Sequence, residues 1–178
     1  LVEESTKREL TEEELNELRT AINNLAALNT SYGQQEYVFD NLVEKARAGG
    51  IDFKDKDTTN SFLSEFGTAV KAYKDYLTQS YNDANLQIED YKRKNEALLK
   101  QGAITEAQYN EFNQSFMSAQ SKLKDLYDSA ISDMMSDVEQ VIGVVQSSAL
   151  SNLNEVYKKA KEDYANSSWW HKLWHSET

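Results

Sequence analysis

The sequence contains no cysteine, which excludes disulfide scaffolds, cysteine nucleophiles and thiolate-bound metal or iron–sulfur sites. It also has no proline and only six glycines, so few residues are available to build turns. A sandwich or barrel of many short strands needs such turns, and we therefore exclude these folds. With 178 residues, the chain is long enough for one ordinary domain or one elongated helical module.

Basic charge and apolar residues are also scarce. Nineteen basic and thirty acidic residues give a net charge of −11. Because proteins that bind nucleic acids carry a basic patch, we expect no nucleic-acid partner. The apolar share of 39% lies below the roughly 45–50% of compact domains. We therefore expect a thin core along a helix–helix seam rather than a thick globular core.

Long hydrophobic runs are missing. The longest candidate, Val141 to Val145, is far shorter than the roughly 18 apolar residues of a membrane-spanning helix. The sequence starts with Leu-Val-Glu-Glu-Ser, which is neither an initiator methionine nor a signal-peptide profile. We interpret the chain as a fragment of a larger protein, so a targeting segment or membrane anchor could lie outside this sequence.

Apolar residues that recur every three or four positions predict three helical stretches. The first begins after Thr11, which forms a capping-box pattern with Glu14, and ends at Gly49-Gly50. Gly33 interrupts this stretch and marks a bend. Its apolar stripe consists of Leu15, Leu18, Ile22, Leu25, Leu28, Tyr32, Phe39, Leu42 and Ala46.

The second stretch follows a short loop and ends at Gly102, with Asp57, Thr58, Thr59 or Ser61 as the candidates for its N-terminal cap. Its stripe consists of Phe62, Phe66, Val70, Tyr73, Leu77, Tyr81, Ala84, Ile88, Tyr91 and Leu98.

The third stretch opens with a second capping-box pattern, Thr105 and Gln108. Its stripe consists of Tyr109, Phe112, Phe116, Ala119, Leu123, Leu126, Ala130, Met134, Val138, Val141, Val145, Leu153, Val156, Ala160 and Tyr164. The steps alternate between three and four up to Ala130 and are then four and four through Met134 and Val138, which is typical of a stutter. Gly143 or Ser147-Ser148 are positions at which this helix could break.

These stretches predict an all-α fold: an elongated antiparallel three-helix bundle, or a four-helix bundle if the third stretch breaks, with coiled-coil-like helical hairpins. We expect residues 1–168 to form the bundle, with helices at about 11–48, 58–101 and 105–166. Residues 169–178 would form a Trp-rich C-terminal tail.

No constellation of residues predicts an enzyme. The only histidines are His171 and His175, and two ligands are too few for a metal site, so we interpret them as exposed tail residues. The Glu-x-x-His pairs of di-iron bundles and the His-Glu-x-x-His pattern of zinc proteases are absent. We expect no cofactor, no metal and no small-molecule substrate.

The loop that starts at Asp55 only partly resembles a calcium-binding loop. Counted from Asp55, position six is Asn60 instead of glycine, and position twelve is Phe66 instead of a bidentate glutamate. We therefore interpret it as a solvated loop whose aspartates cap a helix.

Aromatic residues offer the best candidates for contacts with a partner. Ten tyrosines fall mostly on or beside the stripes, where we expect them to pack with the hydroxyl at the wet edge. Near the C-terminus, Trp169, Trp170, Leu173 and Trp174 carry a large apolar area. Such a segment docks on the bundle, lies on a membrane surface or contacts the next part of a longer chain. Since only Lys172 is basic there, we favour docking or a partner over a membrane.

Two parts of the sequence resemble phage tail tape-measure proteins. They are the joint Leu-Leu-Lys-Gln-Gly-Ala-Ile-Thr-Glu-Ala-Gln-Tyr at Leu98 to Tyr109 and the ending Trp-Trp-x-x-Leu-Trp, and the resemblance covers mainly residues 95–125 and 169–174. It implies an elongated, helical, oligomeric rod or plug inside a tail tube, which moves toward a host membrane at injection. No catalytic residue of that family maps onto this sequence.

We therefore predict a non-enzymatic helical structural or interaction module that associates with itself or with a protein partner. A segment of a phage tail tape-measure protein is the first interpretation, located in the virion tail. The alternative is a secreted or surface-attached bacterial helical bundle: a stalk, an adhesin or a pore-forming subunit. Membrane contact is expected only through the Trp-rich tail.

Overall fold

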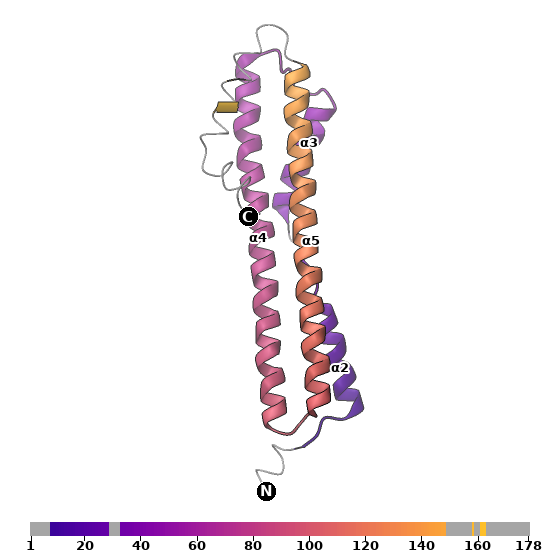
Figure 1. Cartoon of the computed structure of the whole chain (residues 1–178). Coiled ribbons are helices and arrows are strands. Elements are labelled where there is room, and N and C mark those ends of the chain that lie inside the picture. The colour runs from indigo at the N-terminus through magenta and orange to yellow at the C-terminus, as the bar shows by residue number, and fades with distance from the viewer. Residues whose placement is uncertain (1–7, 29–32, 149–157, 159–160, 163–178) are drawn as a thin grey trace. The chain divides into compact units, whose positions relative to one another are not determined.

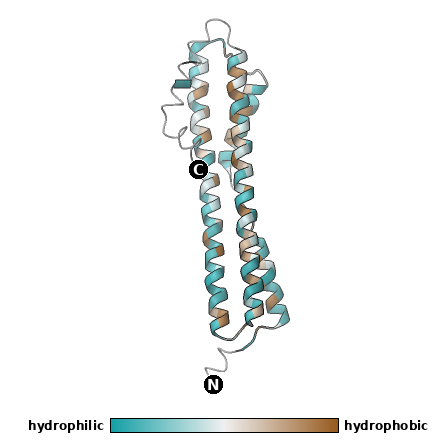
Figure 2. Ribbon diagram, in the orientation of Figure 1, coloured by the Kyte–Doolittle hydropathy of each residue, from teal (hydrophilic) through white to brown (hydrophobic). Residues whose placement is uncertain are grey.

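The computed structural model describes residues 8–28, 33–148, 158 and 161–162. Within these ranges the chain forms helices and no strand, so the all-α prediction is confirmed. The described helices are α2 (Glu12–Asn24), α3 (Gln34–Arg47), α4 (Lys56–Lys100) and α5 (Glu106–Ser147) (Figure 1). Hydrophobic residues recur between hydrophilic ones along α4 and α5 instead of forming long runs (Figure 2).

Several helix ends lie where the sequence predicts them. At the start of α2, the Glu14 amide donates to Thr11 Oγ1 at 3.1 Å and the Thr11 amide donates to Glu14 Oε1 at 3.0 Å. Thr105 and Gln108 make the same reciprocal pair before α5. Gly49 and Gly102 follow α3 and α4 with φ of 75° and 72°, a backbone conformation that residues with a side chain rarely adopt. Both capping boxes and both glycine stops are therefore confirmed.

The first predicted stretch is two helices instead of one helix over residues 11–48. Helix α2 ends with Leu25 as its C-cap, whose amide donates to the Ile22 carbonyl at 3.1 Å. Helix α3 starts after Gly33, which has the non-helical dihedral angles φ −82° and ψ 81°. Gly33 therefore marks a helix start and not a bend within one helix. Asn23 and Asn24 precede the break, and asparagine competes with helix formation by bonding to nearby backbone.

The N-terminal cap of α4 also differs from the prediction. The Asp55 carboxylate accepts hydrogen bonds from the Thr58 amide at 3.0 Å and from Thr58 Oγ1. Thr59, one of the predicted caps, is instead fully buried and donates to the carbonyls of Phe53 and Asp55. The earlier cap starts α4 at Lys56, and it uses Asp55 for helix capping, as the interpretation of this loop expects.

Helix α5 continues through Gly143 and ends at Ser147, so of the two considered break positions only the second coincides with a helix end. Most of the predicted continuation to residue 166 lies outside the described residues. Lys158, Lys161 and Glu162 are described there, and all three are helical and exposed.

The chain divides into two compact units, and α4 and α5 contribute to both. Unit 1 comprises Leu1–Asn29 and Gln79–Tyr127, and unit 2 comprises Thr30–Thr78 and Asp128–Thr178.

The core of unit 1 is formed by α2, the second part of α4 and the first part of α5, and Figure 1 shows α2 beside this part of α5. Phe112 and Leu123 of α5 are fully buried, and Ile22 of α2 and Ile88 of α4 pack in the same cluster. The Leu10 amide donates to the Ala103 carbonyl at 2.9 Å, which attaches the segment before α2 to the α4–α5 joint.

The core of unit 2 is aromatic where α3 meets α4. The Phe39 ring of α3 lies 5.7 Å from the Phe66 ring and 5.3 Å from the Tyr73 ring of α4, measured between ring centroids. Phe62 extends this array toward Phe53 in the loop before α4. Helix α5 adds a row of residues that are at most 2% exposed: Ile131, Met134, Val138, Val141 and Val145.

The buried face of α5 changes register at a different place from the prediction. Leu126 is 38% exposed and Ile131 is 1% exposed, whereas the predicted stripe passes through Leu126 and Ala130. The buried positions step from Leu123 over the half-buried Tyr127 to Ile131, two steps of four that form the stutter. Helix α4 has the same pair of steps at Tyr73, Leu77 and Tyr81.

The stutter residues of the two long helices contact each other inside unit 1. The rings of Tyr81 and Tyr127 stack with a centroid distance of 4.6 Å and an interplanar angle of 22°. The two tyrosine rings fill the interface between α4 and α5 at this point. Here the spacing of buried residues in both helices changes from alternating steps of three and four to two steps of four.

We expect a double-mutant cycle of Tyr81→Leu and Tyr127→Leu to give a coupling energy of about 0.5–1.5 kcal/mol, because the stacked rings gain more than their buried area provides. The measurement is urea unfolding followed by circular dichroism. As a control, Tyr91→Leu and Tyr127→Leu should add to within about 0.5 kcal/mol. Additive effects for the stacked pair would contradict this assignment.

Candidate interaction surfaces

The residues predicted to contact a partner lie outside the described residues. This applies to Trp169, Trp170, Leu173 and Trp174, and equally to His171 and His175. In the part of the chain that the structure describes, no three His, Asp or Glu side chains come together in a way that could hold a metal ion. None of the described helices is long and apolar enough to cross a membrane.

Several acidic groups with shifted pKa values serve helix ends and ion pairs. The Arg8 guanidinium and the Thr11 amide lower the pKa of Glu14 to about 2. Hydrogen bonds from Thr58 lower the pKa of Asp55 in the same way. In unit 1, Arg19 holds Glu111 through two hydrogen bonds of 2.7 and 3.2 Å and thereby lowers the pKa of that carboxyl. These carboxylates are used to start helices and to join them.

Asn95 is the one polar residue of α4 in unit 1 that is buried at 2% exposure. Its Nδ2 donates to the Tyr109 carbonyl at 3.3 Å and to Asn113 Oδ1 at 3.2 Å, which joins α4 to α5. Its Oδ1 is buried without a hydrogen-bond partner. A polar pair in an apolar seam disfavours other registers, since a shifted register would leave more polar atoms unpaired.

Four acidic residues of α3 and α5 lie close enough to Tyr73 to act on its charge: Glu36, Asp40, Asp133 and Asp137. Partial burial, together with the charges of Asp137 and Glu44, raises the pKa of Asp40, although much of this side chain remains exposed. Burial and the neighbouring carboxylates raise the pKa of Tyr73 to about 12. Arg47 opposes this charge by binding Asp137 at 3.0 Å and Gln140.

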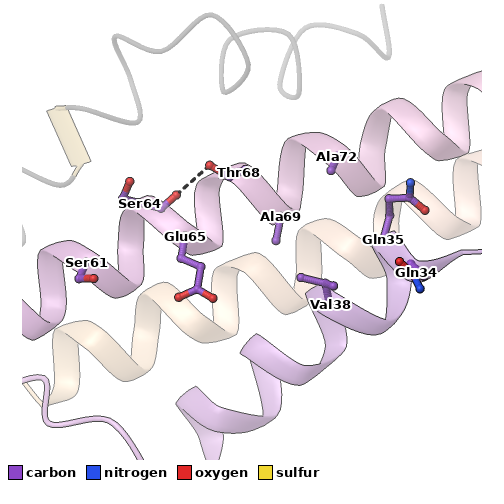
Figure 3. A pocket seen from close by; sticks show the side chains of 9 residues that line it. All are labelled: Gln34, Gln35, Val38, Ser61, Ser64, Glu65, Thr68, Ala69 and Ala72. Atoms are coloured by element: carbon purple, nitrogen blue, oxygen red, sulfur yellow. Dashed lines mark hydrogen bonds between the residues drawn. The ribbon is translucent and has the colours of Figure 1, made fainter.

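An open groove lies on the surface of unit 2. Gln34, Gln35 and Val38 of α3 face α4 across a hollow of about 600 Å³ (Figure 3). Helix α4 lines it with mostly short side chains: Ser61, Ser64, Glu65, Thr68, Ala69 and Ala72. A second hollow of about 600 Å³ shares Ser61 and Glu65 and extends toward Gly50 and Ile51.

Exposed large apolar side chains are found in both units. Tyr37 is 69% exposed and lies on α3 beside Val38 of the groove, while Leu86 of α4 and Met117 of α5 are about as exposed in unit 1.

Compared with protein-family models, curated proteins and solved structures, the chain gives no match. The interpretation of these surfaces therefore depends on their own chemistry.

The groove and the buried Asn95 were not predicted from the sequence. A signal for the groove is present: Ser61, Ser64, Thr68 and Ala72 follow helical spacing beside the apolar stripe, which indicates a face with short side chains. For Asn95 the signal is its position, seven residues before Gly102 and in line with Ile88, Tyr91 and Leu98 of the predicted stripe.

We expect Asp40→Asn to make unit 2 more stable at pH 7. A carboxyl whose pKa is raised on folding stabilises the fold only below its unfolded pKa of 3.8, and this contribution is lost as the pH rises. The gain from the substitution should therefore vanish when the pH falls below about 3.8. Urea unfolding at several pH values provides the measurement.

Glu14→Gln serves as a control of opposite sign. Because the pKa of Glu14 is lowered from 4.5 to about 2, its stabilisation is present above pH 4.5 and is lost as the pH falls. This variant should be less stable than the parent at pH 7, and the difference should shrink as the pH falls below 4.5 and disappear below about 2. If the two variants change stability in the same direction at pH 7, the assigned electrostatics are wrong.

Proposed function

We propose that the chain is a non-enzymatic structural or interaction module, built as an antiparallel helical bundle with coiled-coil-like hairpins. The observation that carries this proposal is the use of its polar side chains. Arg19 joins α2 to Glu111 of α5, Arg47 joins α3 to Asp137 of α5, and Asn95 joins α4 to Asn113 of α5. In the described part of the chain, these polar side chains join one helix to another.

A segment of a phage tail tape-measure protein is the more specific proposal. The joint that carries this resemblance, Leu98 to Tyr109, contains a left-handed Gly102 and the Thr105–Gln108 capping box, so it is a sharp and well-capped turn between two long helices. Helices of 45 and 42 residues suit a rod-like protein. In this setting the exposed Tyr37, Leu86 and Met117 would contact further copies or other tail proteins.

The Trp-rich tail remains a proposed protein contact. Trp169, Trp170, Leu173 and Trp174 together offer an apolar surface with little basic charge. The net charge of −11 disfavours binding to nucleic acids and to anionic membrane surfaces. We therefore propose a protein surface as the partner of this tail.

We expect the chain to associate with itself as its concentration rises, because large apolar side chains are exposed on both units. Multi-angle light scattering should give a mass that increases above the 20.4 kDa of one chain. Met117→Glu should reduce the association, whereas Ser118→Glu, which adds the same charge at an exposed polar position of the same helix, should not. A strict monomer at all concentrations would contradict self-association.

A liposome-leakage assay separates this proposal from a pore-forming subunit. The proposed module leaves vesicles intact. Leakage that Trp170→Ala abolishes would contradict a protein-binding tail and would favour the secreted or surface-attached alternative.

A further inference from the structure

The groove between α3 and α4 has the shape of a binding site for one more helix. Four exposed residues of α4 line it along one face: Ser61, Ser64, Thr68 and Ala72. Thr68 Oγ1 donates to the Ser64 carbonyl at 3.2 Å, which keeps this polar side chain close to its own helix (Figure 3). Short side chains allow another helix to approach α4 closely, with Val38, 45% exposed, as the apolar wall on the α3 side.

The sequence after α5 carries a stripe of the same spacing. Leu153, Val156, Ala160 and Tyr164 follow each other in steps of three, four and four, and the four groove residues of α4 do the same. A stripe with this spacing forms the apolar face of a helix, and such a face can pack against the short side chains of α4.

The described residues of this segment fit a helix with one face reserved for packing. Lys158, Lys161 and Glu162 are helical and exposed. At about 100° per residue, Lys158 and Glu162 lie on the side of the helix opposite to the apolar stripe. Their exposure leaves the apolar side for a contact.

A short connection after α5 is enough for the chain to reach the groove. Helix α5 ends at Ser147, and Figure 1 shows this end and the start of α4 at the same end of unit 2. A segment that turns back after Ser148 then runs parallel to α4. Residues 148–152 are enough for the turn, since helix–helix connections in bundles have about 2–8 residues.

Charge also favours this segment. The charged lining residues of the two hollows are Asp57, Glu65 and Lys45, two of which are acidic. Lys159 and Lys161 flank the apolar stripe of the segment, where they can approach the Glu65 carboxylate.

From these observations we infer that residues 152–164 of the same chain dock in the α3–α4 groove as an additional helix of unit 2. The large side chains Leu153, Val156 and Tyr164 lie over Ser61, Ser64 and Ala72, and Ala160 lies over Thr68. This inference does not depend on the proposed function.

The absence of cysteine in the chain allows a direct test with introduced pairs. Thr68→Cys with Ala160→Cys should form a disulfide within one chain, because the docked helices bring the two positions together. The matched control is Ser136→Cys with Ala160→Cys, since Ser136 is exposed on the face of α5 opposite to its buried row. At low micromolar protein, the first pair should oxidise at least about tenfold faster than the control.

A third variant links the result to the apolar stripe. Val156→Asp, added to the Thr68→Cys and Ala160→Cys pair, should slow disulfide formation to the rate of the control, because docking would bury its charge. Equal rates for the first pair and the control would overturn the inference. Disulfides that form between chains at low concentration would also overturn it, because they would assign the groove to a second copy.

Discussion

The burial of narrow apolar stripes between helices is the interaction on which the structure depends. Helix α4 has 45 residues, yet its mean composition is polar, and only one position in three or four is buried. Helices of this kind gain most of their stability from packing. Each buried phenylalanine or leucine contributes about 1.5–3 kcal/mol, so residues such as Phe39, Phe112 and Leu123 determine whether helices form at all.

The polar contacts set geometry more than they add stability. Arg19–Glu111 and Arg47–Asp137 lie at the edges of the stripes, where ion pairs contribute little to the free energy of unfolding. The buried Asn95 lowers the stability of the fold, because its Oδ1 has no hydrogen-bond partner even in the observed register. The seam of unit 1 therefore gives up some stability for a defined α4–α5 pairing.

Features decided by a few neighbouring residues could be predicted from the sequence. The capping box at Thr11, the glycine stop at Gly102 and most of the stripes depend only on local chemistry and periodicity. The stutter could not be located, because Leu126 and Tyr127 both continue a helical pattern, and only the stack with Tyr81 decides which one turns inward. The residue that caps α4 could not be singled out for a similar reason: Asp57, Thr58, Thr59 and Ser61 have the same local preference as Asp55, which makes the cap.

The candidate interaction surfaces were less predictable than the fold. The groove in unit 2 exists because α3 and α4 pack through Phe39 and Phe66 and leave the Ser61–Ala72 face of α4 open. The packing of α3 on α4 depends on residues that are far apart in the sequence, so the groove could not be predicted from the sequence of α4 alone. The Trp-rich tail has a clear sequence signal, and its partner depends on molecules outside this chain.

The most direct test of the stripe account compares two charged substitutions on α5. Phe112 is fully buried and Met117 is 67% exposed, and both lie in the same helix of unit 1. The account predicts that Phe112→Asp lowers the helical circular dichroism signal far beyond one residue, because α2 and the adjoining parts of α4 and α5 lose their shared core. Met117→Asp should leave the signal unchanged. Retention of full helicity and unfolding cooperativity by Phe112→Asp would contradict the account.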